Sequence, residues 1–207
     1  MGGTAAPDGR AIFAVRPIEA VDRPAVSAML ARAFADDPVM RFMFPDTADR
    51  QRKLPRLFGL LLDSALPLGG CDVTVDGETA GLWRPPGKAD IPVWEILLHL
   101  GGFLGVYGLR GGVRALRLLA TLERRHPTEA HWYLMVLGTD PLRQGKGFGG
   151  IALRHRLARI DAARQPAYLE ASKPENVAFY TAFGFEQQGE LPIPSGPVIY
   201  PMWRPAR

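Results

Sequence analysis

The sequence predicts an α/β (α+β) fold in which a mixed β-sheet is flanked by helices. Two observations carry this prediction. Short β-rich runs alternate along the chain with segments whose apolar residues recur at helical spacing. The composition, 47% hydrophobic and 22% charged, is that of an ordinary globular protein, and 207 residues are enough to bury one substantial core. We therefore expect a flexible tail over residues 1–10, a single domain over 11–207 and a helical insert within it over 91–125.

The first elements expected are a strand and two helices. The apolar run at 11–17 is typical of a strand. Asp22 is a suitable N-cap for the helix that follows, Pro24 fits its first turn, and Pro38 ends it. A second helix is expected over 49–66.

The middle of the chain predicts a hairpin and then a helical region. Two β-rich runs within residues 71–87 flank Asp76-Gly77, a pair that favours a tight turn between antiparallel strands. Residues 91–125 have a mostly helical pattern, which glycines interrupt: Gly101, Gly102, Gly111 and Gly112.

A strand and a helix follow. The run at 130–140 is apolar on both faces, so we expect a central strand there. The helix expected over 147–164 should bury three apolar residues and leave three arginines more exposed: Leu153, Leu157 and Ile160, then Arg154, Arg156 and Arg159.

The C-terminal part predicts three more strands and a short helix. Residues 166–172 have a strand pattern. Ser172 and Glu175 fit a capping box for a short helix, which Gly184 ends. Two last strands are expected, joined by the Pro-Ser-Gly-Pro turn at 194–197.

The stretch 143–150, which reads RQGKGFGG, forms a glycine-rich loop between the central strand and the next helix. Backbone N–H groups at a helix start point outward, and the helix dipole places partial positive charge there. Because glycines have no Cβ atom, a diphosphate can approach these groups closely. Gln144, Gly147 and Gly149 fit the pattern Gln/Arg-x-x-Gly-x-Gly/Ala. A solvated loop with a glycine-rich N-cap is the alternative for this cluster taken alone. Two basic residues can add charge at the rim: Arg143 and Lys146.

Two other phosphate-binding loops fit less well. A P-loop needs glycine at Asp140 and Ser or Thr at Gly147, so that pattern fails at both positions. Gly145, Gly147 and Gly150 satisfy Gly-x-Gly-x-x-Gly, and Glu170 follows at the spacing of ribose recognition, which would suit a nicotinamide-dependent oxidoreductase. That fingerprint normally lies at the first strand of its domain, and too few residues follow Gly150 for the rest of a doubly wound sheet.

The run from 131 to 205 resembles the GCN5-related N-acetyltransferases, the GNAT superfamily, and more narrowly its puromycin N-acetyltransferase-like branch. The stretches that carry the resemblance are HWYL, QGKGFGG, YLEAS, FYTAFGF and the closing PSGP turn. The resemblance implies the GNAT fold, with a mostly antiparallel central sheet of about six to seven strands. It also implies acetyl-CoA as cosubstrate and transfer of the acetyl group to the amine of a small molecule, such as a drug or metabolite.

The resemblance also assigns roles to single residues. In the superfamily, a bulge in the strand before the loop frees backbone N–H groups for the acetyl carbonyl. The matching residues are Leu137, Gly138 and Thr139, and Gly138 suits a bulge. Asn176 and Tyr180 lie four apart on one helix face. The Asn position contacts the cofactor arm, and the Tyr position lies beside the sulfur, where a phenol can protonate the departing thiolate. The diphosphate is expected on the N–H groups of Gly145, Lys146, Gly147, Phe148, Gly149 and Gly150.

The expected reaction is direct attack of the amine on acetyl-CoA in a ternary complex. No Ser-His-Asp or Cys-His pairing is evident, and the only cysteine, Cys71, falls in the predicted hairpin. The amine must lose a proton, and Glu170, at a strand end near the cofactor, is the first candidate base. An acyl-CoA sensor without turnover is the alternative to an enzyme. Other candidate bases are a water chain or one of four side chains: His131, Glu95, Asp36 and Asp37.

The acceptor pocket is expected in the regions that match the superfamily least. These are residues 34–44, the strand end at Trp83-Arg84 and the 91–125 insert, whose glycines could mark a mobile lid. Three aromatic residues of the insert either line an apolar pocket or pack the insert onto the sheet: Trp94, Phe103 and Tyr107.

Charge and composition restrict the partners. The net charge of +4 mildly favours an anionic ligand, but the basic residues are scattered, so no nucleic-acid partner is expected. The longest uncharged run is too short to span a membrane. The four histidines lack metal-ligand spacing with Cys or acidic residues, so no metal is expected. We expect a cytoplasmic monomer or homodimer, because a lone cysteine fits a reducing compartment.

Overall fold

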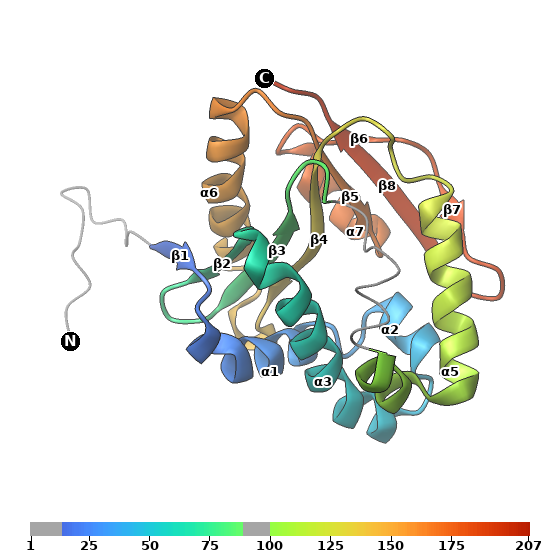
Figure 1. The fold of residues 1–207 in the computed structure, drawn as a ribbon. Coiled ribbons are helices and arrows are strands. Elements are labelled where there is room, and N and C mark those ends of the chain that lie inside the picture. Colours follow the sequence, from blue (N-terminus) through green and yellow to red (C-terminus); the bar gives the residue numbers. More distant parts are fainter. Residues whose placement is uncertain (1–13, 89–99) are drawn as a thin grey trace.

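The computed structural model describes residues 14–88 and 100–207, which share one eight-stranded sheet (Figure 1). Its strands are β1 (Val15–Pro17), β2 (Cys71–Thr74), β3 (Thr79–Arg84), β4 (Trp132–Thr139), β5 (Ala167–Ala171), β6 (Glu186–Gln187), β7 (Leu191–Pro192) and β8 (Val198–Arg204). They lie in the order β1-β2-β3-β4-β5-β8-β6, with β7 also paired to β8. The pair β4–β5 is parallel and the other recorded pairs are antiparallel. This mixed, mostly antiparallel sheet confirms the predicted fold class.

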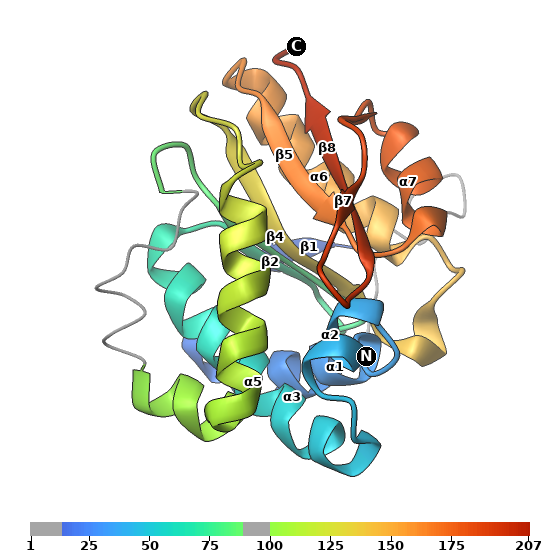
Figure 2. The ribbon, with the colours of Figure 1, turned by 90° about the vertical axis from the view of Figure 1, so that its right-hand side faces the viewer.

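Helices cover both faces of the sheet. They are α1 (Arg23–Ala33), α2 (Pro38–Met43), α3 (Thr47–Ala65), α5 (Leu100–Glu123), α6 (Phe148–Ala162) and α7 (Pro174–Thr181). Figure 2 shows α5 in front of the sheet and α6 behind it. One hydrophobic cluster joins α1, α3 and α5 to the front face, through Leu30, Phe58 and Val106. A second cluster joins α6 and α7 to the back face, through Leu153 and Tyr180.

The sheet splits between its two parallel strands. β4 and β5 pair from Trp132 to Leu134, where the last partners are Leu134 and Leu169. Beyond that point β4 continues to Thr139 along β3, and β5 continues along β8. The facing edges of β4 and β5 therefore diverge toward their C-terminal ends, which leaves backbone N–H and C=O groups without a strand partner on that side.

A β-bulge lies in β4 just past this split. Leu82 of β3 pairs with Val136, but the next residue, Trp83, pairs with Leu134, so Met135 is the extra residue. The bulge expected at Leu137 to Thr139 is therefore wrong in position. Met135 and Val136 both pack in the cluster of the front face, as a two-for-one bulge allows.

Gly138 stays in regular register opposite Ala80, and its lack of a side chain has another reason. A Cβ atom at Gly138 would lie 2.6 Å from Cδ2 of Leu30 and 2.9 Å from Cε2 of Phe34. The glycine thus lets the C-terminal end of α1 pack directly against the end of β4.

The first helix ends earlier than predicted. Asp22 and Pro24 occupy its start as expected, although the Asp22 side chain pairs with Arg16 and does not cap the helix. α1 stops at Ala33, and Pro38 begins the separate helix α2. Asp37 is the N-cap of α2, and its Oδ1 accepts hydrogen bonds from the N–H groups of Val39 and Met40. Pro38, the first residue of the helix, has no N–H group that would need an acceptor. The predicted helix at 49–66 and the hairpin turn at Asp76-Gly77 are confirmed as α3 and the β2–β3 connection.

The insert and the last helix differ in detail from the expectation. The backbone break in α5 is at Gly108, with φ 60°, rather than at the glycines expected. The N-cap of α7 is Lys173, so the capping box expected from Ser172 and Glu175 is wrong. Three strands, not two, close the chain: the two-residue strands β6 and β7, and the seven-residue strand β8. The expected tail at 1–10 and the start of the 91–125 insert lie outside the described residues, so that division stays a prediction.

Helix α6 follows the prediction except at one arginine. Leu153, Leu157 and Ile160 are buried as expected, but Arg156 is buried too. Its Nε donates to Oδ2 of Asp72 on β2 at 2.7 Å, and its guanidinium lies over the Trp132 ring. The helical pattern does not reveal a buried arginine whose partner lies far away in sequence.

Candidate active site

A cavity of 460 Å³ lies at the C-terminal ends of β4 and β5. Its walls come from the end of β4, the first turn of α6, the turn between β5 and α7, one face of α7, and the α1–α2 connection. Eleven of the twelve predicted cofactor-binding residues line it: Leu137, Gly138, Thr139, Gln144, Gly145, Gly147, Phe148, Gly149, Gly150, Asn176 and Tyr180. Lys146 does not, and its Nζ donates to the carbonyl oxygen of Leu142 instead.

The glycine-rich loop exposes the start of α6 to this cavity. Gly145 and Gly147 have φ of 74° and 85°, a region that glycine adopts without strain. Gly147 is the N-cap of α6 and has no side chain that could occupy the N–H groups of the first turn. The first turn of a helix has no acceptor for its N–H groups within the helix, so these donors face whatever enters the cavity.

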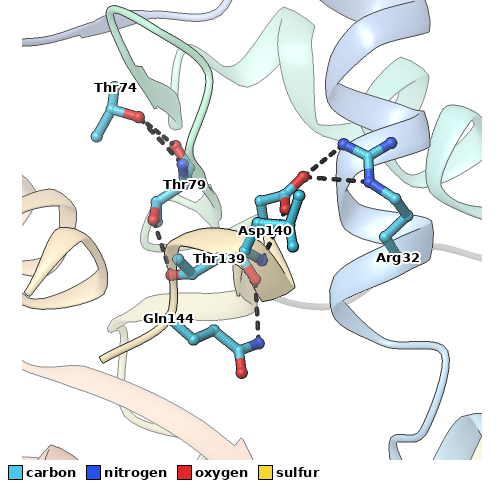
Figure 3. A network of polar contacts seen from close by, with 7 residues as sticks. Arg32, Thr74, Thr79, Thr139, Asp140 and Gln144 are labelled. Atoms are coloured by element: carbon cyan, nitrogen blue, oxygen red, sulfur yellow. Dashed lines mark hydrogen bonds and ion pairs between the residues drawn. The ribbon is translucent and has the colours of Figure 1, made fainter. Parts of the chain in front are cut away.

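Polar contacts fix the loop against the strand end and against α1 (Figure 3). Nε2 of Gln144 donates to the carbonyl oxygen of Thr139 at 3.2 Å, and the hydroxyls of Thr139 and Thr79 are 2.7 Å apart. On the other side, Oδ2 of Asp140 pairs with Arg32 of α1 at 2.5 Å. Gln144, identified from the sequence as a ligand of the cofactor, therefore also holds the loop in place.

Tyr180 reaches the cavity from α7. Its ring packs edge to face against Phe179 and Phe185, and only 8% of the residue is exposed. Burial raises the pKa of the phenol above its ordinary value, so the side chain stays protonated and can donate a proton. Asn176 lies one turn earlier on the same helix and lines the same cavity.

The side chain of Glu170 points to the face of the sheet opposite to α6 and α7. Its neighbours Leu169 and Ala171 belong to the cluster under α6 and α7, so the alternation of β5 turns the Glu170 side chain toward the α5 side. Oε2 accepts a hydrogen bond from the hydroxyl of Tyr133 at 2.6 Å. Oε1 is buried and accepts no hydrogen bond from the described residues. Burial, followed by the charge of Glu170, raises the pKa of Tyr133 well above its ordinary value.

The other candidate bases are placed differently. Asp37 lines the cavity and is buried, and its second oxygen accepts a hydrogen bond from the hydroxyl of Ser172. Asp36 is exposed. His131 is buried beside the start of β4, with Nδ1 2.6 Å from the carbonyl oxygen of Glu129. Glu95 lies outside the described residues.

Several lining residues were not identified from the sequence. Ser172 and Lys173 line the cavity, whereas the sequence suggested only a helix cap there. Phe179 of α7 lines it as well, and so does Phe34, which follows α1 and belongs to the 34–44 region expected at the acceptor pocket. In the sequence, the only sign of Ser172, Lys173 and Phe179 is that they lie in or next to the YLEAS and FYTAFGF stretches. The contact between the end of α1 and the end of β4 arises only in the folded structure.

The residues expected at the acceptor pocket lie in different surroundings. Tyr107 stacks on Phe44 with ring centroids 5.4 Å apart, so of the two roles expected for it, packing of the insert is the one observed. Trp83 is buried on the α6 face. Trp94 and the side chain of Phe103 lie outside the described residues.

Cys71 lies in β2 of the predicted hairpin, and its side chain is buried in the core. Burial raises the pKa of its thiol to about 12, so it is a poor nucleophile near neutral pH. Within residues 14–88 and 100–207, no group of three His, Cys, Asp or Glu side chains could hold a metal ion. None of the helices described there is long and apolar enough to cross a membrane.

Comparisons with known proteins point to one class of enzyme. No family model matches the chain. A curated protein from Schizosaccharomyces pombe, named as an uncharacterised N-acetyltransferase, is 28% identical over 190 residues, which cover 86% of this chain and 76% of that protein. A solved structure from Corynebacterium glutamicum, described as a histone acetyltransferase and related acetyltransferase, is 26% identical with a TM-score of 0.73, covering 94% and 97% of the two chains.

Two further structures share the fold at lower identity. An arylalkylamine N-acetyltransferase from Aedes aegypti has a TM-score of 0.64 at 14% identity, covering 95% of this chain and 100% of that one. A polyamine N-acetyltransferase from Drosophila melanogaster has a TM-score of 0.61 at 18% identity, covering 93% and 99%. The narrower resemblance to the puromycin branch stays a prediction, because these proteins carry other names. The sheet topology and the similarity to named acetyltransferases lead to the same conclusion: the chain is an enzyme of the acetyltransferase class, and its fold and its relatives support the GCN5-related N-acetyltransferase superfamily.

Proposed function

We propose that this protein transfers the acetyl group of acetyl-CoA to the amine of a small molecule, by direct attack in a ternary complex. One observation carries the proposal: the first turn of α6, the diverging edge of β4 and the phenol of Tyr180 surround one cavity. This arrangement gives a diphosphate, an extended arm and a thioester sulfur separate partners along one path.

The cofactor has two kinds of backbone partner on this path. The N–H groups from Gly145 to Gly150 suit the diphosphate, because they are positively polarised and no side chain covers the N-cap. The edge of β4 that has left β5 suits the amide groups of the pantetheine arm, which can pair with it as a strand would.

The chemistry requires two proton transfers and one oxyanion site. The amine nitrogen attacks the thioester carbon, and backbone N–H groups at the end of β4 stabilise the oxyanion. Tyr180 then donates its proton to the departing thiolate, which suits a phenol kept protonated by burial, and the phenolate takes up a proton from water before the next turnover. Glu170, on the α5 side of the split, takes the proton that the amine must lose. The buried thiol of Cys71 argues against a covalent acyl-enzyme.

The acceptor is a small amine. Two proteins of the same fold are named for agmatine or arylalkylamine acetylation, so these compounds, together with puromycin, are the first acceptors to try. The face of the cavity formed by Phe34, Asp37 and Ser172 offers an apolar surface beside a buried carboxylate, which suits a ligand with an apolar body and an ammonium group.

The test is release of free thiol from acetyl-CoA in the presence of an amine panel. We expect release that depends on at least one amine, together with a higher melting temperature in acetyl-CoA but not in NADH. Stabilisation by acetyl-CoA without thiol release for any amine would favour the sensor alternative. Stabilisation by NADH alone would favour the oxidoreductase.

A further inference from the structure

We propose that the carboxylate of Asp37, positioned by Ser172, binds the ammonium group of the acceptor amine and rejects acceptors that carry a carboxylate beside that nitrogen. The inference rests on the proposed function and deepens it, because it assigns the choice of acceptor to one residue. It leaves the proton transfer to Glu170 as proposed. An ammonium group of a primary amine has three N–H bonds, so one can donate to Asp37 while another is lost.

Three hydrogen bonds hold the carboxylate of Asp37. Oδ1 accepts from the backbone N–H groups of Val39 and Met40, at 2.9 and 3.1 Å. Oδ2 accepts from the hydroxyl of Ser172, which follows β5. A carboxylate offers about four acceptor sites, so the open one is on Oδ2. Because Asp37 and Ser172 both line the cavity, a ligand there can donate an N–H group to this oxygen.

The charge of this carboxylate has no basic partner among the side chains that the structure describes. Asp37 takes no part in their ion pairs. The buried guanidinium of Arg50 donates to the carbonyl oxygens of Ala35 and Phe44 instead. Asp37 is 4% exposed, and water screens the attraction between charges much less at a buried group. An organic cation that enters the cavity is therefore attracted to Asp37 more strongly than to a surface carboxylate.

The role of a helix cap does not by itself explain this residue. Asp46 is the N-cap of α3 and accepts a hydrogen bond from the N–H group of Asp49, yet it is exposed. Asp37 differs in its burial, in its contact with a residue 135 positions away and in its place at the cavity. Asp46 shows what capping requires, and the additional features of Asp37 point to a ligand.

The apolar surface beside Asp37 suits the body of an amine. Phe34 lines the same cavity and packs against Phe58, with ring centroids 5.1 Å apart. The turn between Phe34 and Asp37 is closed by a backbone hydrogen bond, from the N–H group of Asp37 to the carbonyl oxygen of Phe34 at 3.1 Å. The carboxylate and the aromatic ring are thus held in one geometry before a ligand binds, which lowers the entropy cost of binding.

Of the residues described as lining the cavity, the basic ones lie at the proposed cofactor site. Arg143 belongs to the loop before α6, and Lys173 is the N-cap of α7. The phosphates of acetyl-CoA suit these two cations. A carboxylate beside the acceptor nitrogen would instead approach Asp37, and like charges that are brought together in a binding site repel each other. We therefore expect the protein to accept amines and to reject the corresponding amino acids.

The experiment measures ligand binding by calorimetry to the full chain saturated with CoA, which has no acetyl group to transfer. The ligands are phenethylamine and phenylalanine, which share an apolar body and differ by one carboxylate. Asp37→Asn removes the charge and keeps a side chain that caps a helix equally well. Asp46→Asn is the matched control, because it removes the charge of a helix cap that does not line the cavity.

We expect the wild type to bind phenethylamine at least about tenfold more tightly than phenylalanine. Asp37→Asn should weaken phenethylamine binding about tenfold, the effect of losing one hydrogen bond to a charged group, and should narrow the difference between the two ligands. Acetyl-CoA affinity should stay the same in this variant, and Asp46→Asn should bind all three ligands as the wild type does. Wild-type phenethylamine binding in Asp37→Asn would overturn the inference and leave Asp37 as a cap.

Ser172→Ala provides a second test, because it keeps both the cap and the charge but removes the donor that holds Oδ2. We expect phenethylamine binding to weaken about threefold, while phenylalanine is still rejected. Unchanged phenethylamine binding in Ser172→Ala would contradict the positioning role of Ser172. The proposed function is tested separately by thiol release from acetyl-CoA. If no amine stimulates that release, the transferase is rejected, whereas the binding comparison still decides the role of Asp37.

Discussion

The two sides of the split sheet take their polar groups from different sources: one local sequence motif on one side, and distant segments of the chain on the other. On the α6–α7 side, the groups expected to hold the cofactor are mostly backbone, positioned by glycines that are close together in the chain. On the α5 side, the polar groups are side chains from distant segments, such as Glu170 with Tyr133 and His126. The difference explains why a local motif predicts the proposed cofactor site, whereas the proposed acceptor side could be described only from the folded structure.

The largest loss of affinity is expected in the glycine-rich loop, where backbone N–H groups alone are proposed to bind the diphosphate. Gly147→Asp places a carboxylate beside the expected diphosphate and strains a residue with φ 85°. We expect acetyl-CoA affinity to fall at least about a hundredfold, or about 2.7 kcal/mol, measured by calorimetry. Gly77→Asp is the matched control, because Gly77 has φ 77° and equally open surroundings but lies in the β2–β3 turn. Equal affinity in the two variants would contradict the assignment of the loop.

Tyr180→Phe tests the one side chain on the cofactor side that is expected to do chemistry. Removing the hydroxyl should lower kcat about a hundredfold and leave acetyl-CoA affinity nearly unchanged, because the ring still fills its place. Steady-state kinetics with a calorimetric affinity measurement separates the two quantities. Tyr200→Phe, which packs against the same cluster without lining the cavity, should keep its kcat. Unchanged turnover in Tyr180→Phe would exclude Tyr180 as the acid.

Gly138→Ala tests how closely α1 packs against the end of β4. The added methyl group would overlap Leu30 and Phe34 of α1, so α1 must shift or the side chains must repack. We expect a loss of about 1–3 kcal/mol in the free energy of unfolding, measured with denaturant. Gly105→Ala on α5, where a Cβ atom meets nothing within 4 Å, should be neutral or stabilising. Equal stability of the two variants would mean that the contact of α1 with β4 is loose.

The smallest effect is expected for the ion pair that joins α1 to the loop. Arg32→Met removes the partner that lowers the pKa of Asp140. A lowered carboxyl pKa stabilises the folded state at neutral pH, and this contribution is lost as the pH falls through it. Because 57% of the Arg32 side chain is exposed, we expect at most about 1 kcal/mol at neutral pH, and less at about pH 3. Arg52→Met, which breaks an exposed pair within α3, should behave similarly without affecting the loop. A loss of several kcal/mol would contradict a surface role.

The sequence predicted the features that depend on local pattern. The hairpin at Asp76-Gly77, the central strand and α6 with its glycine start were all identified, because turn residues and apolar periodicity act over a few positions. The residues proposed for the cofactor came from a resemblance over one third of the chain, and nearly all of them line one cavity.

The errors share a physical origin in contacts between distant segments. Ser172 looked like a helix cap, but its hydroxyl donates to Asp37, which is 135 residues away. Arg156 looked exposed, but it pairs with buried Asp72. Gly138 suggested a bulge, whereas its missing side chain makes room for α1. The position of the bulge at Met135 follows from strand pairing, which no local pattern records.

The central claim is that the diphosphate of CoA binds the backbone at the start of α6. A crystal structure of the protein with acetyl-CoA tests it most directly. The account predicts phosphate oxygens within hydrogen-bond distance of the N–H groups between Gly145 and Gly150, with the sulfur beside Tyr180. Acetyl-CoA bound elsewhere, with this loop in contact with water alone, would contradict it.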